Sequence, residues 1–142
     1  MPITGYSDPI YDAIRTHLTT NWTATDLQFP NEEYESVGPT PWVKVEIHGT
    51  DYSQMSIGES VQADNRWDQE GMLWLYLAIP RGSGLSAGRG AAKALANLFR
   101  GQTFLGGSLE FMDAAIGIGA PGDEEGPWYI LPVSIEWRRM ND

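Results

Sequence analysis

The side chains that could carry out catalysis are few, and none has the spacing that a familiar type of enzyme site requires. The chain has no cysteine, which excludes thiol nucleophiles, disulfides and thiolate metal sites. Its two histidines, His17 and His48, fall in an expected helix and an expected strand, and neither has a serine and an acid in a catalytic context. Metal-binding spacings such as H-E-x-x-H and the EF-hand loop are absent. We therefore expect no enzyme activity, no catalytic residue and no metal site.

One glycine motif has the form of a phosphate-binding turn. The segment Gly82–Ala87 reads G-S-G-L-S-A, follows an expected strand and opens an expected helix. The free N–H groups at a helix N-terminus can bind phosphates. The chain offers only two good helices, however, which are too few for the repeated βαβ units of a dinucleotide domain. A turn with close helix–sheet packing is the favoured interpretation, no cofactor is expected, and a small nucleotide-binding α/β domain stays open as an alternative.

Length and charge limit the remaining possibilities. A chain of 142 residues without an internal linker predicts one domain spanning 1–142. It carries 19 acidic and 9 basic residues, for a net charge of −10, which argues against general nucleic-acid binding. No apolar run approaches the roughly 20 residues that span a bilayer, so no membrane partner is expected. The first residues do not form a secretion signal, and we expect the protein to be made and used in a cytoplasm.

The segment between Gly71 and Gly101 predicts a strand, a glycine-rich turn and a helix. In the expected strand Met72–Ile79 the odd positions are aliphatic, and the even positions include Trp74 and Tyr76. Alternate side chains of a strand point to opposite faces of its sheet, so burial of both faces of this strand is favourable. A second copy of the protein could cover the face that few helices leave open. The helix is expected from about Leu85 to Arg100, with Gly101 after its end.

The other elements follow from the same kinds of pattern. A helix begins after the capping residue Asp8 and ends near Asn21. The segment 49–70 is too long for a structureless loop, and we predict a projecting β-hairpin with a turn near Gly58. Pro132 lacks a backbone donor, so its strand is expected at a sheet edge or with the unpaired side outward. Further strands are expected near Leu27–Phe29 and over Trp42–His48, Leu109–Ile116 and Trp128–Trp137. Together these elements predict a single α+β domain, with a mixed or antiparallel sheet packed by two main helices.

Two kinds of side chain are candidates for contact with another protein. Aromatic residues and arginine are enriched at protein interfaces. Core packing explains the tryptophans equally well, and a basic stripe such as that of the second helix is usually a solvated helix face. The basic residues of the second helix include a third of all the positive charge and could meet acidic loops of an adjacent copy. The candidate interface residues are Tyr52, Met55, Ile57, Trp67, Trp74, Tyr76, Arg89, Lys93 and Arg100.

An acidic loop precedes the last strand and contains Asp123, Glu124 and Glu125. Three adjacent side chains converge poorly on one cation, so a solvated acidic loop is the favoured interpretation. If such loops faced a central channel, they would repel passing DNA and prevent it from sticking.

The order of these motifs resembles the tail terminator proteins of long-tailed, siphovirus-like bacteriophages and related gene transfer agents. The resemblance covers most of the chain, and no single segment of it is a catalytic signature. The segments are Phe29-Pro30-Asn31 after the first helix, Pro41–Val45, the approach Arg66–Gly71 to an apolar strand ending in Pro80, the Gly82–Gly84 turn before an alanine-rich helix ending Leu98-Phe99, and the closing run Trp128–Ile135.

The resemblance implies a structural role in virion assembly. Members of that family form a six-membered ring on the last ring of the tail tube, stop tube growth and offer the surface that joins the head. For this chain it implies a homo-hexamer that contacts the tail tube protein and a head–tail connector or neck protein, at the head-proximal end of the tail, assembled in the bacterial cytoplasm. DNA would pass through the ring without specific binding. A neck or head-closure subunit is the alternative within the same class.

Overall fold

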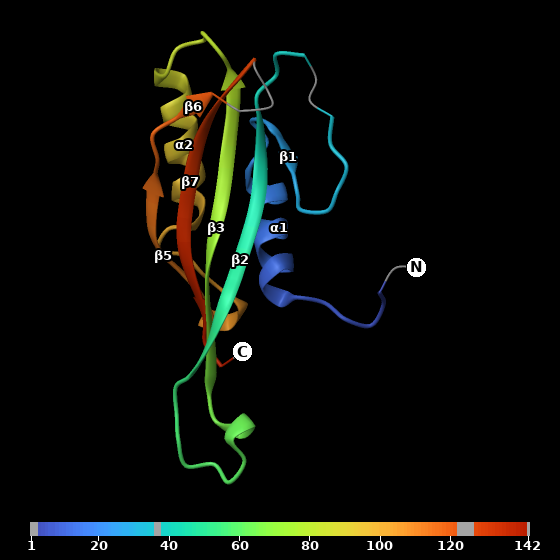
Figure 1. Cartoon of the computed structure of the whole chain (residues 1–142), viewed down its shortest axis with the longest axis vertical. Helices are drawn as coiled ribbons and strands as arrows, with labels where there is room; N and C mark the ends of the chain where they lie inside the picture. Colours follow the sequence, from blue (N-terminus) through green and yellow to red (C-terminus); the bar gives the residue numbers. More distant parts are fainter. Residues whose placement is uncertain (1–2, 36–37, 122–126, 142) are drawn as a thin grey trace.

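The computed structural model describes residues 3–35, 38–121 and 127–141. Within them, one twisted seven-stranded sheet has two helices packed against one of its faces (Figure 1). The helices are α1 (Pro9–Asn21) and α2 (Ser86–Phe99), and two short 3₁₀ turns are η1 (Gln62–Asp64) and η2 (Leu105–Gly107). The strands are β1 (Asp26–Gln28), β2 (Trp42–Gln54), β3 (Trp67–Pro80), β4 (Thr103–Phe104), β5 (Leu109–Ile116), β6 (Ala120–Pro121) and β7 (Trp128–Arg139).

The sheet is mixed because its first strand runs parallel to the second, while every other described pair is antiparallel. The strand order is β1-β2-β3-β7-β5-β4, and β6 pairs with β7 beyond the end of β5. The hairpin formed by β2 and β3 continues well past the body of the sheet (Figure 1). The predicted α+β class, with two main helices and a projecting hairpin, is therefore confirmed.

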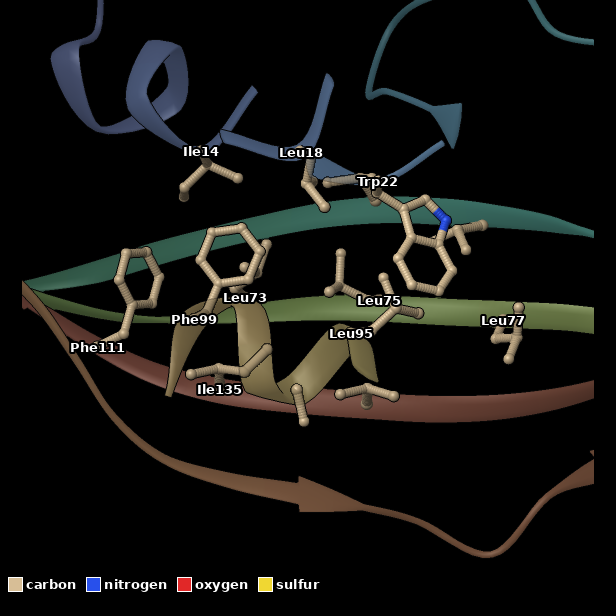
Figure 2. Close-up of a cluster of buried hydrophobic side chains, with 14 of the residues drawn as sticks. Ile14, Leu18, Trp22, Leu73, Leu75, Leu77, Leu95, Phe99, Phe111 and Ile135 are labelled. Atoms are coloured by element: carbon tan, nitrogen blue, oxygen red, sulfur yellow. The ribbon is translucent and has the colours of Figure 1, made fainter. Parts of the chain in front are cut away.

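The core lies between the helices and one face of the three long strands. The register aligns Leu75 with Val45 on one side and with Val133 on the other, and all three side chains are almost fully buried. In Figure 2, Leu18 of α1 and Phe99 of α2 approach this same face. Burial of a large aliphatic side chain contributes about 1.5–3 kcal/mol, so this apolar face holds the helices on the sheet.

The helix boundaries have local causes. The Asp8 carboxylate accepts a hydrogen bond from the Ile10 N–H at 3.0 Å, and Pro9 occupies the first turn of α1, where its missing donor costs nothing. Gly88 lets α2 approach the sheet closely, because a Cβ at this position would lie 2.7 Å from Ile79 and 3.1 Å from Leu131. Gly101, with φ of +73°, turns the chain after α2.

The strand that contains Pro132 is central, so the first of its two predicted placements, at a sheet edge, is wrong. β7 pairs with β3 on one side and with β5 and β6 on the other. The Pro132 carbonyl accepts a hydrogen bond from Gly117 N–H at 2.9 Å, just where β5 ends. The N and O atoms of one strand residue point to the same side, so the missing donor faces the gap between β5 and β6. The gap between two short partner strands allows proline in a central strand.

A tight steric fit lies where the hairpin leaves the sheet. Trp137 of β7 is 1% exposed, and its indole covers the paired residues Gly49 and Gly71. A Cβ at Gly71 would clash with both this indole and the His48 carbonyl, and a Cβ at Gly49 would lie 2.8 Å from the indole. A register shift follows directly after Gly49, as expected of a β-bulge. The two glycines therefore let a tryptophan seal the core at the root of the hairpin.

A buried carboxylate holds the base of the hairpin against the C-terminal end of the chain. Asp68 is 1% exposed; both its oxygens accept hydrogen bonds from the Arg66 guanidinium, at 2.9 and 2.8 Å, and one accepts from the Asn141 N–H at 2.9 Å. The hydrogen bonds from Arg66 lower the pKa of Asp68, although burial acts in the opposite direction. The ionised form of Asp68 is thus the one that this structure favours.

Replacing Gly71 with alanine should destabilise the protein, because the new Cβ has no space beneath Trp137. Overpacking of this kind costs about 1–3 kcal/mol, and urea denaturation measures the expected fall in the free energy of unfolding. Gly90→Ala is the matched control, since a Cβ at this exposed position in α2 meets nothing within 4 Å. Alanine there should stabilise by about 0.5–1 kcal/mol. Equal effects of the two substitutions would contradict the steric account.

Replacing Asp68 with asparagine should lower the free energy of unfolding by about 1–3 kcal/mol at neutral pH. Because the folded-state pKa of Asp68 is lowered, its contribution is complete above the unfolded pKa of about 3.9 and is lost as the pH falls through the folded pKa. The variant should therefore lose less stability than the wild type on acidification from about pH 5. Urea titrations at several pH values measure how the free energy of unfolding of the variant and of the wild type changes with pH. Glu59→Gln is the exposed control on the same hairpin. Parallel pH profiles for Asp68→Asn and the wild type would refute the assignment.

Candidate assembly surfaces

Both histidines have structural partners. The His17 Nε2 lies 2.8 Å from the Leu98 carbonyl, and the Asn21 amide lies 3.2 Å from the other ring nitrogen. An Nε2–H that donates to the Leu98 carbonyl joins α1 to α2. His48 lies on the sheet surface, 3.2 Å from the Glu46 carboxylate. Among the described residues, no three His, Asp or Glu side chains converge to hold a metal ion.

The glycine turn before α2 borders a hollow whose described lining residues are all uncharged. Gly82 and Gly84 have φ of +86° and +88°, which lets the chain reverse sharply between β3 and α2. The hollow beside the turn is lined by Ile79, Pro80, Leu85 and Tyr129 along with the two glycines. β3 and the next long strand, β5, are separated in the sheet by the antiparallel β7, so the two do not form the adjacent parallel pair of a dinucleotide domain.

The sheet face opposite the helices, here called the helix-free face, presents an aromatic pair at its centre. Trp74 and Tyr76 project there from β3, and their rings stack with centroids 5.9 Å apart and planes inclined by 9°. Both are only half-buried, and Pro132 of β7 lies beside Tyr76 in the register. The strand therefore carries aliphatic side chains toward the core and aromatic side chains toward an open surface.

Charged residues of β2 border this aromatic pair. Glu46 lies opposite Trp74 in the register, and its carboxylate is 3.5 Å from the Lys44 ammonium and 3.2 Å from His48. Burial and, to a lesser degree, the Glu46 charge raise the pKa of Tyr76, so its hydroxyl stays protonated and able to donate. An apolar centre with a charged border is the usual arrangement of a protein interface.

One end of the helix-free face is already covered. Trp42 and Trp128 meet edge to face at 6.1 Å, and Tyr34 lies against Trp42 at 5.2 Å. Ala78, which pairs with Trp42, is consequently only 1% exposed. The sequence placed Trp42 near polar residues and gave no sign of this cluster, because its members come from segments almost a hundred residues apart. The cluster leaves Trp74 and Tyr76 as the open part of the face.

The tip of the β2–β3 hairpin, residues 55–66, exposes apolar side chains on an ordered loop. Met55, Ile57 and Val61 are 50%, 90% and 54% exposed, and Tyr52 at the rim is 59% exposed. The loop is held together by its own hydrogen bonds, among them Met55 N–H to the Arg66 carbonyl at 2.7 Å. Further such bonds join Arg66 N–H to Ser56 Oγ, Glu59 N–H to Asn65 Oδ1 and Gln62 Nε2 to Gln54 Oε1. Exposed apolar residues on a rigid loop indicate a contact surface.

Trp67 differs from the other predicted interface residues of the hairpin. It begins β3 and is half-buried, and its indole N–H donates to the Gln62 carbonyl at 3.3 Å. The Trp67 side chain thus packs at the base of the tip and holds it in place, and it is less exposed than Met55 or Ile57.

The basic residues of α2 line a groove against β5. Arg89 and Lys93 are one turn apart on the helix, and Arg100 follows at its end, with its Nε bound to Asn97 at 2.6 Å. The floor of the groove is formed by Ala96 of α2 and by Ala114 and Ile116 of β5. The three basic side chains are exposed, and in the part of the chain that the structure describes they form no ion pair. The sequence predicted the basic stripe, but the contribution of β5 depends on the tertiary fold.

The predicted residues therefore form three separate surfaces: the hairpin tip, the open aromatic pair and the basic groove. The acidic loop Asp123–Glu125 lies outside the described residues. None of the described helices is both long and apolar enough to cross a membrane.

Comparisons with known proteins give a family match and a fold match. A family model described as phage tail terminator protein matches residues 9–137, which include every described strand except the last two residues of β7. No curated protein matches the chain. One solved structure has 16% sequence identity and a TM-score of 0.63, and the match covers 91% of this chain and 94% of that one. At this identity the structural match shows a shared fold alone.

The family match extends over almost the whole chain and includes the segments that form the sheet, both helices and the hairpin. A tail terminator is a structural component of the phage tail. The chain belongs to the phage tail terminator protein family.

Proposed function

We propose that copies of this chain form a closed ring, with six members, on the last ring of the phage tail tube. The ring stops polymerisation of the tube and offers its opposite side to the head–tail connector or neck protein. The family supports the tail location, and the three surfaces of the fold support repeated contacts between copies. The protein acts as a structural part of a siphovirus-like phage or gene transfer agent and has no catalytic role.

The open aromatic pair is the observation that carries this proposal. Trp74 and Tyr76 are stacked and only partly buried at the centre of a sheet face, next to a charged border. A single copy gains nothing from leaving two large aromatic rings in water, whereas a partner that covers them removes apolar area at about 25 cal/mol per Å². Tryptophan and tyrosine are also the residues that most often dominate binding energy at interfaces. This face is therefore our candidate for contact with a neighbouring copy or with the tube.

A ring is the expected outcome when one contact surface of a copy meets a different surface of the next copy and the rotation closes. The hairpin tip and the basic groove are different surfaces of that kind. We further propose that the acidic loop Asp123–Glu125 faces the channel, where its charge repels DNA passing from head to tail. A ring with these loops on its outer rim would refute the placement of the loop.

Deletion of the gene should produce overlong tails without heads, because no ring then stops the tube. Electron microscopy of particles from the deletion strain measures tail length and head attachment directly. Expression of the chain from a plasmid should restore normal tails and serves as the control. Tails of normal length that fail to join heads would instead assign the protein to the neck or head closure. Normal infectious particles would contradict both assignments and lead to a nucleotide titration of the turn at Gly82.

Replacing both Trp74 and Tyr76 with serine should abolish the ability of the plasmid copy to restore joined particles. Loss of one central aromatic anchor costs about 2–4 kcal/mol of association, so the count of joined particles should fall at least about tenfold. Ile118→Ser is the matched control, since this side chain is 95% exposed and lies outside the three surfaces. Circular dichroism of the purified variants checks that each remains folded. Full complementation by the folded double variant would remove the aromatic pair from the interface.

A further inference from the structure

The projecting hairpin combines negative charge with exposed apolar side chains. Between positions 51 and 70 the chain has five acidic residues and one basic residue, Arg66, which is already bound to the buried Asp68. At the tip itself, Glu59 and Asp64 are exposed beside Met55 and Ile57. Figure 1 shows that the tip extends beyond the sheet, at the end opposite the start of α2. A surface of this composition fits a partner that is both basic and apolar.

The groove between α2 and β5 has that complementary composition. Arg89, Lys93 and Arg100 border it, and Ala114 and Ile116 form part of its floor. β4 pairs only with the start of β5, at Leu109 and Glu110, so the outer edge of β5 from Met112 onward has no partner strand among the described residues. An open strand edge next to a groove is a site at which another chain docks readily.

The distribution of charge favours another copy as the occupant. Arg15, Lys44, Arg66 and Arg138 each form an ion pair within the chain, while the three basic residues of the groove form none among the described residues. In a molecule of net charge −10, a concentration of unpaired positive charge attracts the acidic surface of an identical molecule.

We propose that the hairpin tip of one copy docks into the α2–β5 groove of the next copy, with Glu59 and Asp64 facing Arg89 and Lys93. The apolar side chains of Met55 and Ile57 then cover Ala96, Ala114 and Ile116 at the floor. The contact rests on the proposed ring, for which it supplies the joint between subunits. Because tip and groove lie on different parts of one molecule, each copy gives one tip and receives another, as a heterologous closed ring requires.

Charge exchange tests this contact with the intact chain. Arg89→Glu with Lys93→Glu makes the groove acidic, and Glu59→Lys with Asp64→Lys makes the tip basic. Each double variant should self-associate on the order of 100-fold more weakly than the wild type, because like charges then meet at every joint. An equimolar mixture should assemble again, since an acidic tip meets a basic groove, and a basic tip meets an acidic groove, around an alternating ring. Arg81→Glu, a charge reversal outside the groove, should leave association unchanged.

A cysteine cross-link gives a second readout, and the absence of native cysteine makes it unambiguous. A mixture of Ile57→Cys and Asn97→Cys should form a disulfide-linked heterodimer on mild oxidation, and a chain that carries both should form a ladder of oligomers. Ile118→Cys mixed with Asn97→Cys is the control and should give no heterodimer.

The outcomes separate the contact from the ring. The contact is supported if the mixture of the two charge variants assembles while neither variant does so by itself, and if the specific cross-link forms. If both charge variants assemble as well as the wild type and no cross-link forms, the proposed contact is wrong, while the proposed ring is unaffected. A wild type that does not associate in solution, shows no cross-link and forms no ring in the particle overturns the contact and the proposed ring together.

Discussion

The packing of both helices on one face of the sheet is the constraint on which the other features depend. Leu73, Leu75 and Leu77 complete the core with α1 and α2, so one apolar layer supplies the stability of the monomer. Neither of the two described helices is then left for the opposite face, where the tryptophan pair Trp42 and Trp128 covers only one end. The centre of that face stays open, and in the proposed ring stability and assembly therefore use opposite sides of the same strands.

The extension of β2 and β3 into a projecting hairpin depends on a second constraint. Trp137 closes the core at the root of the hairpin only because Gly49 and Gly71 have no side chains. Beyond this point the hairpin has no helix to pack on, and Asp68 anchors its base through Arg66 and the C-terminal turn. In the proposed joint between subunits, a tip already held by its own hydrogen bonds loses less conformational entropy on binding.

The sequence predicted the helices and strands themselves better than it predicted which of them lie side by side in the fold. The strand predicted at Leu109–Ile116 has the bounds of β5. The polar segment 49–70 correctly indicated a hairpin, because a structureless loop of that length is rare in a compact domain. The edge placement considered for β7 was wrong, because Pro132 indicates that one backbone donor is missing and does not indicate which strands lie beside it. The Trp42–Trp128 cluster and the β5 side of the basic groove join segments far apart in the chain, and local patterns contain no information about such pairs.

The central claim is that exposed surfaces of this fold join copies into a ring at the end of the tail. A cryo-electron microscopy reconstruction of the head-proximal end of purified tails tests it most directly. The account predicts six copies in a closed ring, with Trp74 and Tyr76 covered and each hairpin tip seated on a neighbouring copy. A chain found elsewhere in the particle, or an end of the tail without a ring of this protein, would contradict the account.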